Sequence, residues 1–153
     1  MTSNPAGRTA NTPTFNHVAM TVPADLLDED GRKAILDFYG EVFGWQELPT
    51  ETIDRKRLVM MAYEFGQFVF IEADDKPMTT NPMDHFGMSV STLAELEEFY
   101  DRAKAYSERD DRTVLEDKML DDFGMLELHA FYVRHILPLK VEVQYFNWKQ
   151  QAQ

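Results

Sequence analysis

The sequence predicts an α+β protein in which one unit, a strand followed by a helix and three more strands, occurs twice. Residues 16–22 (NHVAMTV) and 84–90 (DHFGMSV) open the two copies. Each stretch has His in second place, then an apolar residue, a small residue, Met, a hydroxyl residue and Val. A helical pattern follows each stretch, and three strand-like runs follow each helix. This repeated order predicts two copies of one structural unit.

The first copy begins after a polar segment. Residues 1–13 have little apolar surface to bury and are expected to form a flexible arm. Residues 15–22 then read as a strand. Because alternate side chains of a strand face opposite ways, His17, Ala19 and Thr21 share one face. Ala19 and Thr21 are small, so they leave space beside the His17 imidazole that a ligand or a metal ion can fill.

A helix and three short strands complete the first copy. Residues 28–43 carry apolar side chains at helical spacing, and Gly44 is placed to end the helix. Gly66 marks a turn between the last two strands. The three strand-like runs are residues 45–48, 57–63 and 67–73.

The second copy repeats this plan after a polar loop at residues 74–83. His85, Gly87 and Ser89 share one face of its first strand. Thr92 and Glu95 form a capping box, which opens a helix. The helix is expected to bury Leu93, Leu96, Phe99, Tyr100 and Ala103, and the strands that follow it are residues 114–120, 125–133 and 140–146.

Composition limits the classes of function. With 153 residues and 44% hydrophobic content, the chain fits one domain or two small halves that share a core. The absence of Cys excludes disulfides, thiolate metal sites and Cys nucleophiles, so a metal ion must be held by imidazole and carboxylate. A net charge of -12 argues against nucleic acid as a partner.

The sequence predicts a cytoplasmic protein with no membrane partner. No apolar run approaches the roughly 20 residues that a membrane-spanning helix needs. The N-terminus also lacks the charged and apolar regions of a signal peptide.

Two carboxylates complete the candidate site. Glu72 follows His17 by 55 residues, and Glu142 follows His85 by 57 residues. These offsets suggest that each copy contributes a His from its first strand and a Glu from its last, so that packing of the copies brings all four together. Two imidazoles and two carboxylates suit Ni, Zn, Co, Fe or Mn better than Ca or Mg. An octahedral ion would keep two positions for water or for two substrate oxygens.

Each of these residues also has a simpler explanation. A single His in an apolar strand is often a hydrogen-bonded core residue, and Glu72 also fits a solvated strand end beside Asp74. Glu142 is harder to explain in this way, because it lies between Val141 and Val143 and a buried carboxylate needs a partner.

The motifs FNHVAMTV, FYGEVFGW, DHFGMSV and FYVRHILPLKVEVQYF, in this order and spacing, resemble those of the vicinal oxygen chelate superfamily. This superfamily comprises the glyoxalases, bleomycin resistance proteins and extradiol dioxygenases. The resemblance covers residues 14–147 and implies two βαβββ modules, residues 14–75 and 83–147, that form a curled mixed sheet around a metal cleft. Residues 148–153 are left as a tail.

By resemblance to the glyoxalase I type, the metal ligands are His17, Glu72, His85 and Glu142. The first hypothesis is therefore a lyase or isomerase that acts on a small oxygenated substrate through a metal-bound enediolate. Either Glu72 or Glu142 could serve as the catalytic base, and Glu142 is preferred.

Two other functions remain open at this point. An Fe(II) extradiol dioxygenase would use His17, His85 and Glu142, with Tyr132 or His129 as acid or base. The family's signature His is missing, since residues 123–125 are Phe-Gly-Met, and residues 135–138 replace the usual turn before the last Glu. The third hypothesis is a metal-free protein that sequesters a small molecule, like the bleomycin resistance proteins.

The remaining predictions concern the cleft and the assembly. Phe68 and Phe70 share a face with Glu72, where they either pack in the core or form an apolar wall for substrate. Gln144 shares the face of Glu142 and could offer a hydrogen bond. His129 and His135 are expected at the surface or in loops. The resemblance implies a homodimer, with modules paired either within one chain or between two.

Overall fold

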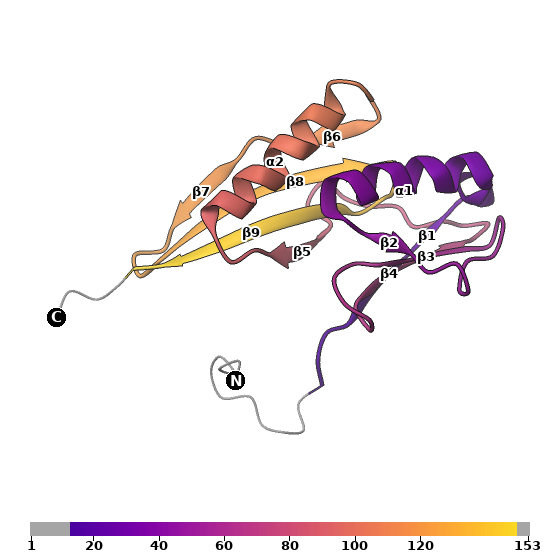
Figure 1. Ribbon diagram of the computed structural model, residues 1–153, viewed down its shortest axis with the longest axis horizontal. Helices are drawn as coiled ribbons and strands as arrows, with labels where there is room; N and C mark the ends of the chain where they lie inside the picture. Colours follow the sequence, from indigo (N-terminus) through magenta and orange to yellow (C-terminus); the bar gives the residue numbers. More distant parts are fainter. Residues whose placement is uncertain (1–12, 150–153) are drawn as a thin grey trace.

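A computed structural model describes residues 13–149 and contains two mixed β-sheets and two long helices (Figure 1). The α+β class and the two βαβββ modules are confirmed. The first module consists of β1 (His17–Val22), the 3-10 helix η1 (Ala24–Leu27), α1 (Glu29–Phe43), β2 (Gln46–Glu47), β3 (Arg57–Met61) and β4 (Phe68–Ala73). The second consists of β5 (His85–Ser89), α2 (Leu93–Ser107), β6 (Thr113–Leu115), β7 (Met119–Asp122), β8 (Leu126–His135) and β9 (Lys140–Trp148).

The two sheets share one topology. The first has the strand order β1-β4-β3-β2, and the second has β5-β9-β8-β6, with β7 also paired to β8. In each module the first strand runs parallel to the last. The opening strands β1 and β5 therefore each lie at the edge of a sheet.

Both predicted helix signals, Gly44 and the capping box of Thr92 and Glu95, are present in the structure. The Asp28 side chain accepts a hydrogen bond from the Gly31 backbone N–H at the start of α1, and Gly44 ends that helix with a φ of 74°. The capping box of Thr92 and Glu95 opens α2. Leu93 corrects one expectation: it is 39% exposed, because it precedes the buried stripe of the helix.

One hydrophobic core joins the modules. Helices α1 and α2 lie side by side along the sheets (Figure 1). The Phe38 ring in α1 packs edge-on against Tyr106 of α2, with centroids 5.0 Å apart, and stacks on His135 of β8 at 4.6 Å. The chain is thus organised as two halves that share a core. Within residues 13–149, no helix is long and apolar enough to cross a membrane.

Three strand boundaries differ from the predictions. The run at residues 45–48 reduces to a strand of two residues, because Trp45 is buried against Tyr39. The predicted strand at residues 114–120 is split at residues 116–118, where the pairing with β8 slips by one residue in the manner of a β-bulge. Finally, β9 continues through Trp148 and takes in the start of the expected tail.

The flexible arm was predicted for residues 1–13, of which residues 1–12 lie outside the described residues. Residues 150–153 of the expected tail also lie outside them.

Candidate functional site

The strongest candidate site lies on the open face of the second sheet, which we define as the face that carries His85 and Glu142, opposite α2. Parallel pairing of β5 with β9 sets His85 beside Lys140 and Gly87 beside Glu142. A Cβ atom at Gly87 would lie 3.6 Å from both Glu142 Oε2 and Gln144 Oε1. Glycine at this position therefore keeps the space above the carboxylate open.

His85 and Glu142 face each other across a short contact on this open face. His85 Nδ1 lies 2.6 Å from the Met83 carbonyl oxygen and must donate its proton there. In a neutral imidazole Nε2 is then an unprotonated acceptor, and it faces Glu142 Oε2 at 3.2 Å. Two acceptors at this distance repel each other unless a proton or a metal ion lies between them. The Glu142 side chain is only 7% exposed, so water cannot easily screen this repulsion.

Tyr132 completes the cluster from β8, where it pairs directly with Glu142. Its ring meets the His85 ring edge-on, with centroids 5.1 Å apart. Burial raises the pKa of Tyr132 to about 12, helped by a side-chain hydrogen bond to Glu142 and by the negative charges of Glu142, Glu116 and Asp121. The phenol therefore keeps its proton near neutral pH.

Lys140 and Glu116 border the cluster and were not assigned from the sequence. Lys140 Nζ lies 2.7 Å from Glu116 Oε1 and 4.9 Å from the centre of the Tyr132 ring. Alternation along the predicted strand already places Lys140 on the face of Glu142, but it gave the residue no role. Glu116 belongs to the bulge between β6 and β7, which no sequence pattern indicated.

The first module places different residues at the equivalent positions. Parallel pairing of β1 with β4 sets His17 beside Phe68, Ala19 beside Phe70 and Thr21 beside Glu72. In the second module Glu142 lies two residues beyond Lys140, the strand partner of His85. The equivalent position in the first module, two residues beyond Phe68, is Phe70. Glu72 therefore corresponds to Gln144 rather than to Glu142.

Glu72 has another partner on its own sheet. Its side chain is half exposed, and one oxygen lies 3.5 Å from Nη2 of Arg57. The same guanidinium lies over the Phe70 ring at 5.0 Å. Arg57 therefore places a cation on the first sheet at the position that Ala130 occupies in the second sheet.

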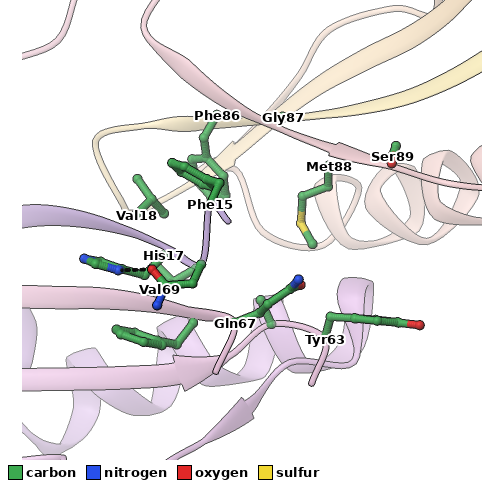
Figure 2. A pocket seen from close by; sticks show the side chains of 13 residues that line it. Phe15, His17, Val18, Tyr63, Gln67, Val69, Phe86, Gly87, Met88 and Ser89 are labelled. Carbon is green, nitrogen blue, oxygen red and sulfur yellow. Dashed lines mark hydrogen bonds between the residues drawn. The ribbon is translucent and has the colours of Figure 1, made fainter. Parts of the chain in front are cut away.

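His17 lies at the free edge of the first sheet. Nδ1 is 2.7 Å from the Asn16 side-chain oxygen, and the imidazole stacks on Phe68 with centroids 4.8 Å apart. This hydrogen bond leaves Nε2 available as an acceptor, as in His85. Figure 2 shows His17 at a cavity of about 390 Å³ between β1 and β5, with Met88 and Ser89 on the opposite wall.

The structure brings two of the four predicted metal ligands together, namely His85 and Glu142. In residues 13–149, no group of three or more His, Asp or Glu side chains is spaced to hold a metal ion. The chemistry of the pair nevertheless fits one: neighbouring ligands of an octahedral ion, each about 2.1 Å from it, lie about 3 Å apart, which is close to the observed 3.2 Å. The roles of His17 and Glu72 as ligands remain predictions.

The other predicted site residues lie on both modules. Gln144 and Tyr132 lie beside Glu142, whereas the half-buried Phe68 and Phe70 lie on the first sheet. They face away from the core side of β4, where Val69 and Ile71 are buried.

His135 corrects an expectation, since it is fully buried rather than at the surface. Its Nδ1 lies 2.9 Å from the Thr113 hydroxyl, and burial lowers the pKa of the imidazole. Alternation along β8 was the signal for burial, since His135 shares a face with the apolar residues Phe131 and Val133. His129 lies half-buried in β8, with its ring 5.9 Å from that of Tyr145.

Comparison with known proteins finds the same architecture at low sequence identity. No protein-family model and no curated protein sequence matches the chain. A glyoxalase/bleomycin resistance protein/dioxygenase from Alicyclobacillus acidocaldarius is 18% identical, with a TM-score of 0.62 over 90% of this chain and 95% of that one. Lactoylglutathione lyase from Agrobacterium tumefaciens is 18% identical, with a TM-score of 0.61 over 88% and 95%. The fosfomycin resistance protein FosX from Listeria monocytogenes is 15% identical, with a TM-score of 0.57 over 88% and 93%.

These likenesses carry the fold and leave the reaction undetermined. They cover both modules, whose order of strands and helices is the one that the sequence repeat predicts. The chain thus has the same fold as these glyoxalase, lyase and fosfomycin resistance proteins.

Proposed function

We propose that the protein is a divalent-metal-dependent enzyme that acts on a small oxygenated substrate, most directly by lyase or isomerase chemistry. The observation that carries the proposal is the contact of 3.2 Å between His85 Nε2 and Glu142 Oε2. The hydrogen bond from Nδ1 to the Met83 carbonyl oxygen fixes the imidazole so that Nε2 points at the carboxylate. Such a bond to the second ring nitrogen is typical of His residues that bind metal ions.

The residues of the cluster suit proton transfer. A bound divalent ion would supply Lewis acidity. The buried Glu142 carboxylate is placed to accept a proton from a substrate carbon next to a carbonyl group. Tyr132 keeps its proton near neutral pH and can return one to the substrate. Glycine at position 87 leaves room for the substrate above these two groups.

A second candidate is the Fe(II) ring-cleaving dioxygenase, and the register of β4 favours it. Phe70 occupies the position equivalent to Glu142, so the modules offer His17, His85 and Glu142 rather than four ligands. Two His and one carboxylate with open positions are characteristic of non-haem Fe(II) oxygenases. Tyr132, in contact with His85, would be the acid or base.

We further propose that a homodimer brings His17 of one chain to His85 and Glu142 of the other. The outer edges of the sheets are protected, because β2 has two residues and a bulge interrupts β6 and β7. The inner edge strands β1 and β5 contain neither Pro nor a Lys, Asp or Glu side chain. Unprotected edges of this kind pair readily with another strand, and the partner's β5 and β1 are suitable occupants.

Metal binding tests the proposal directly. Protein purified without a nickel column should bind about one Mn, Fe, Co, Ni or Zn ion per chain, with a rise in thermal stability. His85→Ala should abolish binding, and His17→Ala should weaken it while the fold is retained. His129→Ala is the matched control, since it removes a strand imidazole outside the cluster. Absence of metal binding would refute the proposal and leave the sequestering protein as the explanation.

Oxygen uptake separates the two reactions. The Fe(II)-loaded protein should consume oxygen with catechols if it is a dioxygenase, and an anaerobic reaction is the control. No uptake with any of several catechols, combined with metal binding, would favour the lyase or isomerase.

A further inference from the structure

A short turn leads into β5 and ends directly before His85. Residues 81–84 form this turn, in which the Asp84 backbone N–H donates to the Asn81 carbonyl oxygen at 3.0 Å. The Asp84 carboxylate also accepts a hydrogen bond from the Asn81 backbone N–H at 2.7 Å. Pro82 is the second residue of the turn, where its fixed φ suits the reversal of the chain. Asp84 therefore closes the turn with both its backbone and its side chain.

The turn holds the carbonyl group to which His85 is bonded. Met83 is its third residue, and the Met83 carbonyl oxygen accepts the Nδ1 proton of His85 at 2.6 Å. Thr80, directly before the turn, donates from its hydroxyl to the Pro138 carbonyl oxygen at 3.2 Å. This bond ties the turn to the connection between β8 and β9. The position of the Met83 carbonyl is thus set by hydrogen bonds on both sides of it.

Glu142 competes with this carbonyl for the one proton of a neutral imidazole. Nε2 of His85 lies 3.2 Å from Glu142 Oε2, so the other tautomer, with its proton on Nε2, would donate to the carboxylate. The carboxylate is the stronger acceptor, because hydrogen bonds to a charged group are stronger than bonds between neutral groups. The Met83 carbonyl can keep the proton on Nδ1 only if it is held close to the ring. Packing does not supply this restraint, since the His85 side chain is 29% exposed.

The first module fixes its imidazole by a different route. Asn16 corresponds to Asp84 in the sequence repeat, because each directly precedes the His of its module. The Asn16 side-chain oxygen lies 2.7 Å from Nδ1 of His17 and contacts the ring directly. Asp84 instead acts on His85 through the turn that it closes. In both modules, the residue before the His therefore decides what Nδ1 meets.

We propose that Asp84 is a positioning residue, which keeps the His85 proton on Nδ1 and so leaves Nε2 available to a cation. This inference rests on the proposed function, because it takes His85 as a metal ligand. The tautomer itself needs no metal and can be measured without one. Without the Asp84 carboxylate, the Met83 carbonyl is no longer held at the ring, and the proton moves to Nε2 to bond Glu142. A divalent ion must then displace this proton, so its affinity falls.

Nitrogen NMR of the metal-free protein reads the tautomer directly, because protonated and bare ring nitrogens differ widely in chemical shift. At a pH at which the imidazole is neutral, the wild type should carry the His85 proton on Nδ1. Asp84→Ala should carry it on Nε2. Asp84→Glu should do the same, since its longer side chain keeps the charge but misplaces the oxygen. Asp84→Asn keeps an acceptor oxygen at the same point of the side chain and should restore the proton to Nδ1.

Titration with Zn²⁺ by calorimetry connects the tautomer to the site. Asp84→Ala should weaken Zn²⁺ binding about tenfold, whereas Asp84→Asn should bind Zn²⁺ as the wild type does. Asp74→Ala is the matched control, because Asp74 closes another turn of the same linker by accepting from the Lys76 backbone N–H. That turn holds no partner of His85, so the control should change neither the tautomer nor the Zn²⁺ affinity.

The outcomes separate this inference from the proposed function. If Asp84→Ala and Asp84→Glu both leave the proton on Nδ1, the inference is wrong, even where these variants lower Tm and the wild type binds Zn²⁺. If Asp84→Ala does not fold, the tautomer of Asp84→Glu decides. If the tautomer shifts in the variants but the wild type binds no Zn²⁺, the positioning role of Asp84 is supported and the proposed enzyme fails.

Discussion

The two modules share a topology and differ in what they carry on it. Each begins with a strand that offers a His with its Nδ1 hydrogen-bonded, and each closes with a strand parallel to the first. At the position where the second module has Glu142, the first has Phe70 under the Arg57 guanidinium. The second module also has longer closing strands, of 10 and 9 residues against 5 and 6.

The difference shows how a duplicated scaffold can divide its tasks. Both modules keep the apolar face of their strands, because both contribute to one core. The opposite faces differ: the second module has a buried carboxylate there and exposed apolar side chains farther along β9, whereas the first has the stacked rings of His17 and Phe68. The comparison predicts that the modules are equally needed for stability and unequally needed for chemistry.

The largest expected effect concerns the shared core. Phe38→Ala should destabilise the protein by about 3–5 kcal/mol, because the ring is fully buried and contacts Tyr106 and His135 of the other module. Urea unfolding followed by circular dichroism measures the change. Unfolding in two separate transitions, one for each module, would contradict a common core.

Metal affinity distinguishes the two closing carboxylates. Glu142→Gln should weaken metal binding by at least about 100-fold, equivalent to about 2.7 kcal/mol, because it removes a charged ligand from a buried site. Glu72→Gln should change the affinity less than about threefold, since Glu72 is half exposed and paired with Arg57. Isothermal titration with the same ion measures both variants. Equal losses would restore the expected four-ligand site.

The junction between the modules should depend on pH through His135. Burial holds the pKa of this imidazole below its ordinary value of 6.5, against the opposing effect of Asp110. The unfolded chain therefore binds the proton more readily, so stability is fully present above pH 6.5 and is lost as pH falls toward the folded-state pKa. Arg112 holds the Asp110 pKa below its usual range, so Asp110 stays charged in this window.

Unfolding free energies measured between pH 8 and pH 5 check this expectation. His135→Gln should flatten the dependence, although the variant itself is less stable at pH 8. His129→Gln serves as the control, since it leaves the buried imidazole in place. An unchanged pH dependence in His135→Gln would contradict the assignment.

The smallest expected effects are at the helix starts, where the modules use different caps. Asp28→Ala and Thr92→Ala should each cost about 1 kcal/mol, which lowers Tm by about 2–4 °C in a chain of this size. Ser91→Ala should change Tm very little, because Ser91 bonds Glu95 through its backbone N–H. A cost at Thr92 below that at Ser91 would argue against the capping box.

The sequence by itself determined the architecture, because its signals are local. The repeat of opening strands, the cap at Thr92 and the αL glycine at Gly44 each act within a few residues, and each has the predicted place in the structure. The burial of Glu142 was also predictable, since the residues on either side of it are apolar.

Only the tertiary structure decided which side chains meet. Strand register places Phe70 opposite Ala19 and sends Glu72 to Arg57, although both residues fit the pattern of a closing strand. His135 and Lys140 acquire their partners from the helices and the bulge, across separations that no local pattern records. Propensity and alternation set which face a residue takes, whereas pairing between distant strands sets its neighbours, and the chemistry of this protein depends on those neighbours.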